Sequence, residues 1–309
     1  MLDPAIKLRH LATFLEVARR EGFARAAAEL HVSQPAVSKT IRELEELLGL
    51  TLIARGAGPF RLTGFGRTFL RHAAVSVGAL QEGIAAARRA GGPEIATVTV
   101  GALPTVSARI LPAAVEAFRR LGLPARVRVV TGPNDHLQAQ LRLGEVAFVV
   151  GRMGDPERMA GFAFEHLYSE RVVMAVRPGH PLAGRAPVLP ERLGAYPMLL
   201  PPPGSIIRPA VERLLLSLGL PAPEDAVETV STAFGRGTVL GTDAVWIISE
   251  GVVAQDVEAG TLALVPVDTR DTWGPVGLTT RVGTALSVPA EALADAIRAV
   301  ASRSRGGAA

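Results

Sequence analysis

The pattern of apolar residues changes at Gly91-Gly92-Pro93, and this change constrains the fold more than any other feature. Before that point, apolar residues recur every three or four positions, which is typical of amphipathic helices. After it, short β-branched runs at 97–100 and 127–130 alternate with a helical stretch at 108–121. Such alternation indicates βαβ units and a parallel sheet. The chain is therefore expected to join a helical head to an α/β body.

These patterns divide the chain into four segments and predict a multi-domain α+β fold. We expect a head at residues 1–63, a linker helix at 64–90, a hinge at 91–94 and a body at 95–303. The body is long enough for two lobes: lobe I from 95–165 and 268–303, and lobe II from 166–267, with crossings near 165–168 and 266–270. Its other expected elements are strands at 148–150, 172–176, 245–248 and 276–278, and helices at 134–143, 206–218 and 289–301.

Positive charge is concentrated in the head and linker. Residues 1–90 contain 13 Lys and Arg against 8 Asp and Glu, a net charge of +5, whereas the remainder has a net charge of −1. A basic segment joined to a neutral body is typical of a nucleic-acid-binding protein, although chance variation would give the same numbers. The chain has no cysteine, which excludes disulfides, thiolate metal sites and a cysteine nucleophile.

The head has the pattern of a helix-turn-helix. A first helix places Leu8, Leu11, Leu15 and Ala18 on one stripe and breaks at Glu21-Gly22. A second helix covers residues 23–30 and is followed by a turn at His31-Val32. In the third helix Ser33 is a good N-cap and Pro35 falls in the first turn, where its missing N–H costs little. Its apolar face consists of Val37, Ile41, Leu44 and Leu48.

Polar residues in the first turns of the third helix suit docking in a major groove. Residues 50–53 and 60–62 indicate a small hairpin wing beyond that helix. The candidate DNA-binding residues are Ser33, Gln34, Pro35, Ser38, Lys39 and Arg42 from the helix, and Arg55 and Arg61 from the wing. On spacing alone, a three-helix bundle with a solvated polar face remains an alternative.

Residues 23–39, FARAAAELHVSQPAVSK, resemble the winged helix-turn-helix signature of the LysR-type transcriptional regulators. Residues 52–55 and 61–66 resemble the family's wing and its exit. The resemblance implies a cytoplasmic, DNA-binding homodimer that reads promoter DNA, responds to a small-molecule effector and works beside RNA polymerase. Homotetramers are also usual in the family, and many members are activators.

The linker helix carries a seam of apolar residues with a spacing of alternately four and three, the pattern of a coiled coil. The seam consists of Gly66, Leu70, Ala73, Val77, Leu80, Ile84 and Ala87. We expect it to pair two chains, and the resemblance implies an antiparallel pair. The alternative is a helix that lies on its own domain, which would need a wider stripe of period 3.6.

The two lobes of the body resemble periplasmic binding proteins, the fold of the LysR effector domain. Ligands of open α/β sheets bind beyond the carboxyl ends of the strands. The candidate effector-binding residues are Thr105, Val106, Thr131, Arg152, Ser205 and Phe234. Arg152 follows a strand and offers a two-pronged donor for a carboxylate. Each residue also has an ordinary structural interpretation: a helix N-cap for Thr105 and Ser205, a surface ion pair for Arg152, and core packing for Phe234.

Several strings of the body resemble one branch of the family, the regulators of protocatechuate catabolism and of galactose-binding proteins. They are residues 100–106, 149–152 and 164–170. This predicts a small organic acid such as protocatechuate as effector and a catabolic or transport operon as target. A sugar sensor or solute-binding protein of the same fold is the alternative, and it would favour stacking aromatics such as Tyr196.

No catalytic pattern is present in the chain. The six histidines are scattered without metal-ligand spacing, and there is neither a Gly-x-Ser-x-Gly elbow nor a phosphate-binding glycine-rich loop. The N-terminus lacks a secretory pattern, and no long apolar run predicts a membrane span. We therefore expect a regulator without a cofactor, and an α/β enzyme with a helical appendage is disfavoured.

Overall fold

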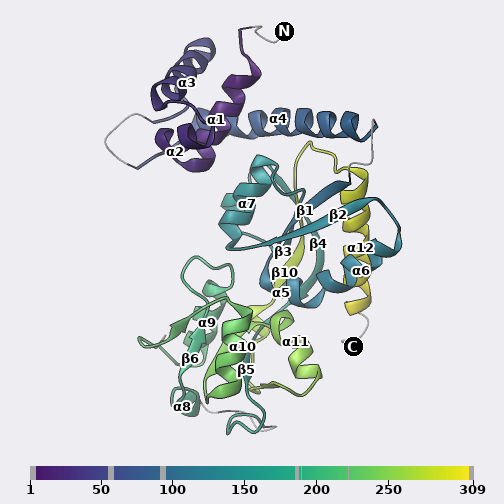
Figure 1. Cartoon of the computed structure of the whole chain (residues 1–309). Coiled ribbons are helices and arrows are strands. Elements are labelled where there is room, and N and C mark those ends of the chain that lie inside the picture. The colour runs from purple at the N-terminus through teal and green to yellow at the C-terminus, as the bar shows by residue number, and fades with distance from the viewer. Residues whose placement is uncertain are drawn as a thin grey trace. The chain divides into compact units, whose positions relative to one another are not determined.

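The computed structural model describes residues 5–54, 59–90, 95–184, 188, 190–221 and 223–305. The chain separates into two compact units, residues 1–96 with 138–146 and residues 97–137 with 147–309. The first contains helices α1 to α4, and the second contains both β-sheets (Figure 1). Within the described residues, no helix is long and apolar enough to cross a membrane.

The head folds into three helices, α1 (Leu8–Arg20), α2 (Phe23–Glu29) and α3 (Gln34–Leu48). Both predicted breaks occur at residues with a left-handed backbone, Glu21 with φ 48° and His31 with φ 54°, a conformation that ends a helix. The predicted N-cap is also confirmed, because the Ser33 hydroxyl accepts from the N–H of Ala36 at 3.4 Å.

The buried face of α1 differs from the predicted stripe. His10, Phe14 and Val17 are the buried residues of this helix; Leu11 and Leu15 of the predicted stripe pack against the same core partly buried, whereas Leu8 is half exposed. Phe14 packs against Phe69 of the linker helix with ring centroids 5.5 Å apart. The predicted stripe lies beside the buried face of the helix, because leucine spacing alone does not show which residues meet Phe69.

The wing is held to α3 by a buried carboxylate. An antiparallel bridge joins Ile53 and Leu62, as the hairpin pattern predicted. Oε1 of Glu45, a residue 8% exposed, accepts from the N–H of Leu52 at 2.7 Å and from the N–H of Ile53 at 3.1 Å. Backbone donors buried at the wing are thus satisfied by one side chain. Arg55 lies outside the described residues.

The first turns of the linker helix α4 (Gly64–Ala90) pack against the head's own core. A Cβ on Gly66 would lie 2.0 Å from the carbonyl oxygen of Leu52, so this glycine permits close packing of helix and wing. Ala73 is 1% exposed within the head core, and Leu70 packs against that core. The prediction that Ala73 contacts a second chain is therefore wrong. Farther along, Leu80 and Ile84 are 44% and 45% exposed.

The first sheet of the body has the strand order β2-β1-β3-β10-β4. Its strands are β1 (Ala96–Ala102), β2 (Ala125–Thr131), β3 (Val149–Arg152), β4 (Phe162–Glu170) and β10 (Gly274–Arg281). Its helices are α5 (Pro104–Arg109), α6 (Leu111–Arg120), α7 (Asn134–Leu143) and α12 (Val288–Arg305), with a 3-10 turn at Pro156–Arg158. Helices α6 and α12 lie side by side (Figure 1) and cover one apolar core.

The second sheet repeats this plan with the order β7-β6-β8-β5-β9. Its strands are β5 (Val172–Val176), β6 (Met198–Leu200), β7 (Val227–Glu228), β8 (Val245–Ser249) and β9 (Ala263–Leu264). Its helices are α8 (Pro190–Leu193), α9 (Arg208–Ser217), α10 (Thr232–Gly241) and α11 (Glu250–Glu258). Trp246 is the largest side chain in its core.

Two predicted boundaries in the body need correction. The helix expected at 108–121 is two helices that meet at Ile110, because Pro112 starts the second of them. Strand β4 stays in the first sheet as far as Glu170, which pairs with Gly274, so lobe I extends to residue 170 instead of 165. The chain crosses to lobe II at Arg171 and returns through a 3-10 turn at Arg270–Thr272.

Candidate functional site

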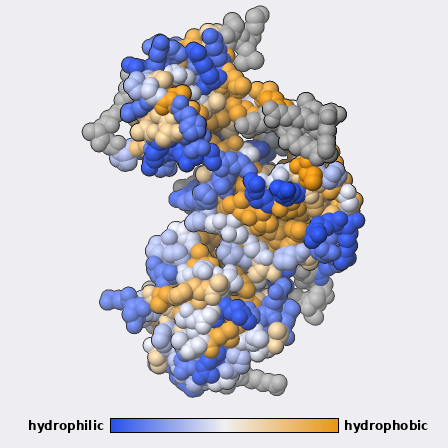
Figure 2. All heavy atoms as spheres, in the orientation of Figure 1, coloured by the Kyte–Doolittle hydropathy of each residue, from blue (hydrophilic) through white to orange (hydrophobic). Residues whose placement is uncertain are grey.

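The exposed face of α3 carries most of the predicted DNA-binding residues. Gln34, Lys39 and Arg42 are exposed, and Ser38 is half-buried. Arg42 donates from Nε to the carbonyl oxygen of Ser38 at 3.3 Å, which leaves its terminal nitrogens available within the described part of the chain. Hydrophilic residues cover much of the face where α2 and α3 lie (Figure 2). This arrangement suits contacts to phosphates and base edges.

The remaining predicted residues of the head lie around this face. Ser33 and Pro35 are exposed at the first turn of α3, and Arg61 is exposed on the wing. Ser33 uses one lone pair of its hydroxyl as the N-cap acceptor, so its O–H proton and a second lone pair remain available to DNA. Lys39 is 74% exposed and its Nζ lies 3.9 Å from the Glu43 carboxylate, a distance at which an exposed pair contributes little stability.

A cavity of about 290 Å³ lies between the two lobes of the body. The wall is formed by residues at the carboxyl ends of β1, β3, β6 and β8 and by the loop after β2. A cavity therefore lies at the strand ends where the sequence predicts a ligand site. Most of the wall is apolar, with Leu103, Pro133, Pro202, Pro203, Ile206, Ile207, Val230, Ile248 and Val252.

Arg152 is the cationic group of this cavity. Its Nη2 donates to the carbonyl oxygen of Thr272, whereas Nη1 is buried without a hydrogen-bond partner. A Cβ on Gly274 would lie 2.3 Å from Nη2, so that glycine gives the guanidinium its space. Burial lowers the pKa of Arg152, as does Arg213 to a smaller extent, and the nearby Glu170 opposes the shift. An anion in the cavity would satisfy the unpaired nitrogen.

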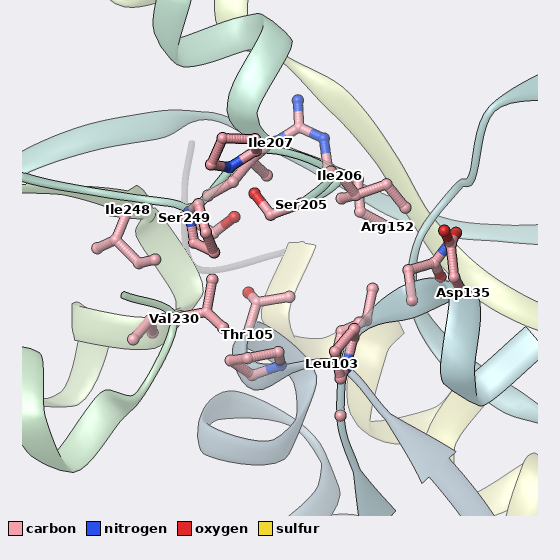
Figure 3. Close-up of a pocket in the computed structure, with 18 residues that line it drawn as sticks. Leu103, Thr105, Asp135, Arg152, Ser205, Ile206, Ile207, Val230, Ile248 and Ser249 are labelled. Atoms are coloured by element: carbon pink, nitrogen blue, oxygen red, sulfur yellow. The ribbon is translucent and has the colours of Figure 1, made fainter. Parts of the chain in front are cut away.

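Two hydroxyl residues predicted for the site also line the cavity. Thr105 is 4% exposed, and its Oγ1 donates to Oε2 of Glu170 at 2.6 Å. Ser205 follows β6, and its Oγ is buried without a partner. Figure 3 shows Thr105, Ser205 and Ser249 around the same central space. Together with Arg152, these groups give the apolar cavity a small set of polar contacts, as expected of a small-molecule site.

Three predicted effector residues lie elsewhere. Val106 is fully buried in the core of lobe I, because one residue along a helix turns the side chain by about 100° away from Thr105. Thr131 is exposed at the end of β2, and the cavity is lined instead by residues 132–135. Phe234 is 51% exposed on α10 and is not among the lining residues; Val230 occupies that side.

The sequence analysis did not single out Glu170, a buried carboxyl that contacts the cavity. It is 1% exposed at the point where β4 passes into lobe II, and its carboxylate contacts the cavity residue Thr105. Burial raises the pKa of the Glu170 carboxyl, while hydrogen bonding from Thr105 and attraction to Arg152 oppose the rise. The available signal was an acidic residue just before the fully apolar run 172–176, because charged residues are rarely buried without a role.

Comparison with known families assigns both halves of the chain. Residues 8–67 match the bacterial regulatory helix-turn-helix of the lysR family, and residues 91–302 match the LysR substrate binding domain. The protein is thus a ligand-responsive DNA-binding regulator and not an enzyme. The chain belongs to the LysR family of transcriptional regulators.

Individual relatives agree with this assignment over nearly the whole length. The chain is 50% identical over 305 residues to the HTH-type transcriptional regulator PcaQ of Agrobacterium fabrum, with 97% of each chain covered. It is 36% identical over 298 residues to the regulator YdcI of Escherichia coli, with 96% of this chain and 97% of that one covered. Among solved structures, a full-length OxyR variant from Pseudomonas aeruginosa has a TM-score of 0.63 at 25% identity, covering 94% of this chain and 97% of that chain.

Proposed function

We propose that this regulator senses a small organic acid, of the aromatic class that protocatechuate represents, and thereby controls a catabolic or transport operon. One observation carries the proposal: Nη1 of Arg152 is buried without a partner in the wall of an apolar cavity. A guanidinium in that position binds a carboxylate through charge-assisted hydrogen bonds. The 50% identity to PcaQ and the resemblance to regulators of protocatechuate catabolism support an aromatic acid.

A sugar effector is less well supported. Sugar sites use aromatic side chains for stacking, and none of the described residues that line the cavity is aromatic. Phe234 is absent from the cavity wall, and Tyr196 instead packs against His180 with ring centroids 4.5 Å apart. Aliphatic and proline residues fit the flat faces of a benzoic acid better than the hydroxylated faces of a sugar.

The acid proposal is tested by calorimetry on the full-length protein with protocatechuate and benzoate. Arg152→Ala should weaken binding by about 10- to 100-fold, the equivalent of about 1.5–3 kcal/mol for a charged hydrogen bond. Arg152→Lys should recover only part of the loss, because an ammonium does not copy the two-pronged guanidinium. Arg126→Ala, at an exposed arginine of β2, is the control. Wild-type affinity in Arg152→Ala would refute a carboxylate contact at this residue.

For the DNA site, we propose that Gln34, Ser38 and Arg42 read the operator from the first turns of α3. Their exposure and the available Arg42 nitrogens support this role. Arg42→Ala should weaken operator binding by about 1–3 kcal/mol, whereas Arg119→Ala, at an exposed arginine of the body, should leave it unchanged. A mobility shift at fixed salt measures both. Unchanged affinity in Arg42→Ala would remove this residue from the reading face.

We further propose that the exposed part of the linker seam, with Leu80 and Ile84, pairs two copies of the chain. A twofold dimer implies an interrupted palindrome as operator, with half-sites about one helical turn apart or a multiple of it. A regulator that reads promoter DNA acts in the cytoplasm, beside RNA polymerase. Footprinting on the promoter of the adjacent operon tests the half-site spacing, and protection of a single half-site would contradict the dimer.

A further inference from the structure

The hydroxyl of Thr105 already has a partner before any ligand binds. Its Oγ1 lies 2.6 Å from Oε2 of Glu170, and the N–H of Gly251 donates to the same carboxyl oxygen at 3.3 Å. Thr105 belongs to α5 in lobe I, Glu170 ends β4, and Gly251 lies in the first turn of α11 in lobe II. The cavity wall at Thr105 is therefore tied to both lobes through one buried carboxyl group.

The direction of the Thr105 hydrogen bond follows from the other contacts of that carboxyl. Oε2 of Glu170 accepts from Gly251, and a backbone N–H can only donate. Oε2 is therefore the favoured acceptor oxygen, because a carboxylic O–H oxygen is the weaker acceptor, and a proton taken up by the carboxyl is favoured on Oε1. In either protonation state of Glu170, the Thr105 hydroxyl is the donor to Oε2. Its proton is committed, and only oxygen lone pairs remain for a ligand.

The local packing keeps Thr105 in this state. A Cβ on Gly251 would lie 2.3 Å from Oγ1 of Thr105 and 2.8 Å from Oε2 of Glu170, so α11 approaches this pair as closely as a glycine allows. Threonine is also stiff about χ1 because it is β-branched. Rotation of the hydroxyl toward a different partner would leave Oε2 with the Gly251 N–H alone, in a region where unpaired polar groups are costly.

We propose that Glu170 fixes Thr105 as a hydrogen-bond acceptor toward the cavity, so that the regulator selects acids that also carry a donor group, a hydroxyl or an amino group. The inference rests on the proposed acid effector. Arg152 binds the carboxylate, and Thr105 distinguishes acids with a donor from those without one. Glu170 acts through Thr105 as a positioning residue, and it makes this selection without itself lining the cavity.

The test is a panel of benzoates bound to the full-length protein and measured by calorimetry. The ring carries hydrogen, fluorine, hydroxyl or amino at position 3 or 4. Wild type should bind the hydroxybenzoates and aminobenzoates about 5- to 10-fold more tightly than the fluorobenzoates and unsubstituted benzoate, the effect of one hydrogen bond. Thr105→Val should abolish both preferences, and Thr105→Ser should keep them.

Variants of Glu170 decide the direction of the bond. Glu170→Gln keeps an oxygen that accepts from Thr105 and should keep both preferences. Glu170→Leu removes that acceptor and frees the Thr105 proton, so Thr105 can also donate; the 3- and 4-methoxybenzoates, whose substituent only accepts, should gain affinity relative to benzoate in this variant and not in wild type. Operator binding and the melting temperature of the body show whether each variant is folded. If Glu170→Leu does not fold, the comparison of Thr105→Val with Thr105→Ser tests the proposal.

Two results would overturn this inference while leaving the acid proposal intact. One is equal affinity of wild type for the aminobenzoates and fluorobenzoates, and the other is no gain for the methoxybenzoates in folded Glu170→Leu. Failure of wild type to bind any acid of the panel would instead refute the acid effector, and the selection by Thr105 would fall with it. The two failures are therefore distinguishable by whether unsubstituted benzoate binds.

Discussion

Gly66 and Gly78 of the linker helix should respond in opposite ways to replacement by alanine. In Gly66→Ala the new Cβ would lie 2.0 Å from the carbonyl oxygen of Leu52 and 2.9 Å from its carbonyl carbon. A normal contact needs more than about 3 Å, so the wing would have to move by about 1 Å, a shift of the kind that overpacked cores resist. Around Gly78 nothing lies within 4 Å of such a Cβ.

The magnitude follows from the contacts that this movement disturbs. The Leu52 carbonyl accepts from the N–H of Thr63 at 2.9 Å and from the Thr63 hydroxyl at 3.2 Å. Overpacking costs about 1–3 kcal/mol and each weakened hydrogen bond about 0.5–1.5 kcal/mol. Alanine recovers about 1 kcal/mol through helix propensity. Gly66→Ala should therefore destabilise the head by about 2–4 kcal/mol, and Gly78→Ala should stabilise it by about 0.5–1 kcal/mol.

Thermal unfolding with two probes isolates the head. Both tryptophans, Trp246 and Trp273, belong to the body, so their fluorescence reports that unit, while far-ultraviolet circular dichroism also reports the head. Gly66→Ala should lower the melting temperature of the head by about 10 °C or more and leave the fluorescence transition unchanged. A head transition equal to that of Gly78→Ala would refute the close contact between linker and wing.

Three further substitutions test other contacts. Glu45→Ala leaves two buried wing N–H groups unpaired and should cost the head about 2–4 kcal/mol in urea unfolding, whereas its exposed neighbour Glu46→Ala should cost almost nothing. Leu80→Asp should convert the dimer to monomer in light scattering, while Leu216→Asp, at a residue 77% exposed in lobe II, should not; an intact dimer in the first would contradict the seam. Since burial raises the pKa of Glu170, wild type should lose unfolding free energy relative to Glu170→Gln as the pH rises above the ordinary glutamate range, and parallel pH curves would contradict that shift.

Local signals in the sequence predicted the elements well. The predicted helix 134–143 and the predicted strand 172–176 begin and end at the same residues as α7 and β5. Periodicity and β-branched runs are properties of contiguous residues, so a single sequence shows them. Ser33 and Pro35 marked the start of α3 for the same reason. The carboxyl ends of the strands then located the cavity, and with it Thr105, Arg152 and Ser205.

The errors arose where a helix has two faces to choose between. In α1 the leucine spacing indicated a stripe of which Leu11 and Leu15 pack only partly buried, whereas Phe14, which meets Phe69 of the linker, lies beside that stripe. In α4 the seam pattern continued through Ala73, which the head buries for itself. Both errors have one cause: the partner of an amphipathic face is set by tertiary packing, and helical periodicity is the same whether that partner is the same chain or another copy.

Glu170 could not be predicted because its partners are far away in sequence. Thr105 lies 65 residues before it and Gly251 lies 81 residues after it, so no local pattern joins the three. Thr105 and Gly251 stand on different lobes, so the proposed selection depends on one carboxyl that contacts both. Residues that determine specificity by positioning others are therefore the part of a binding site that a single sequence reveals least.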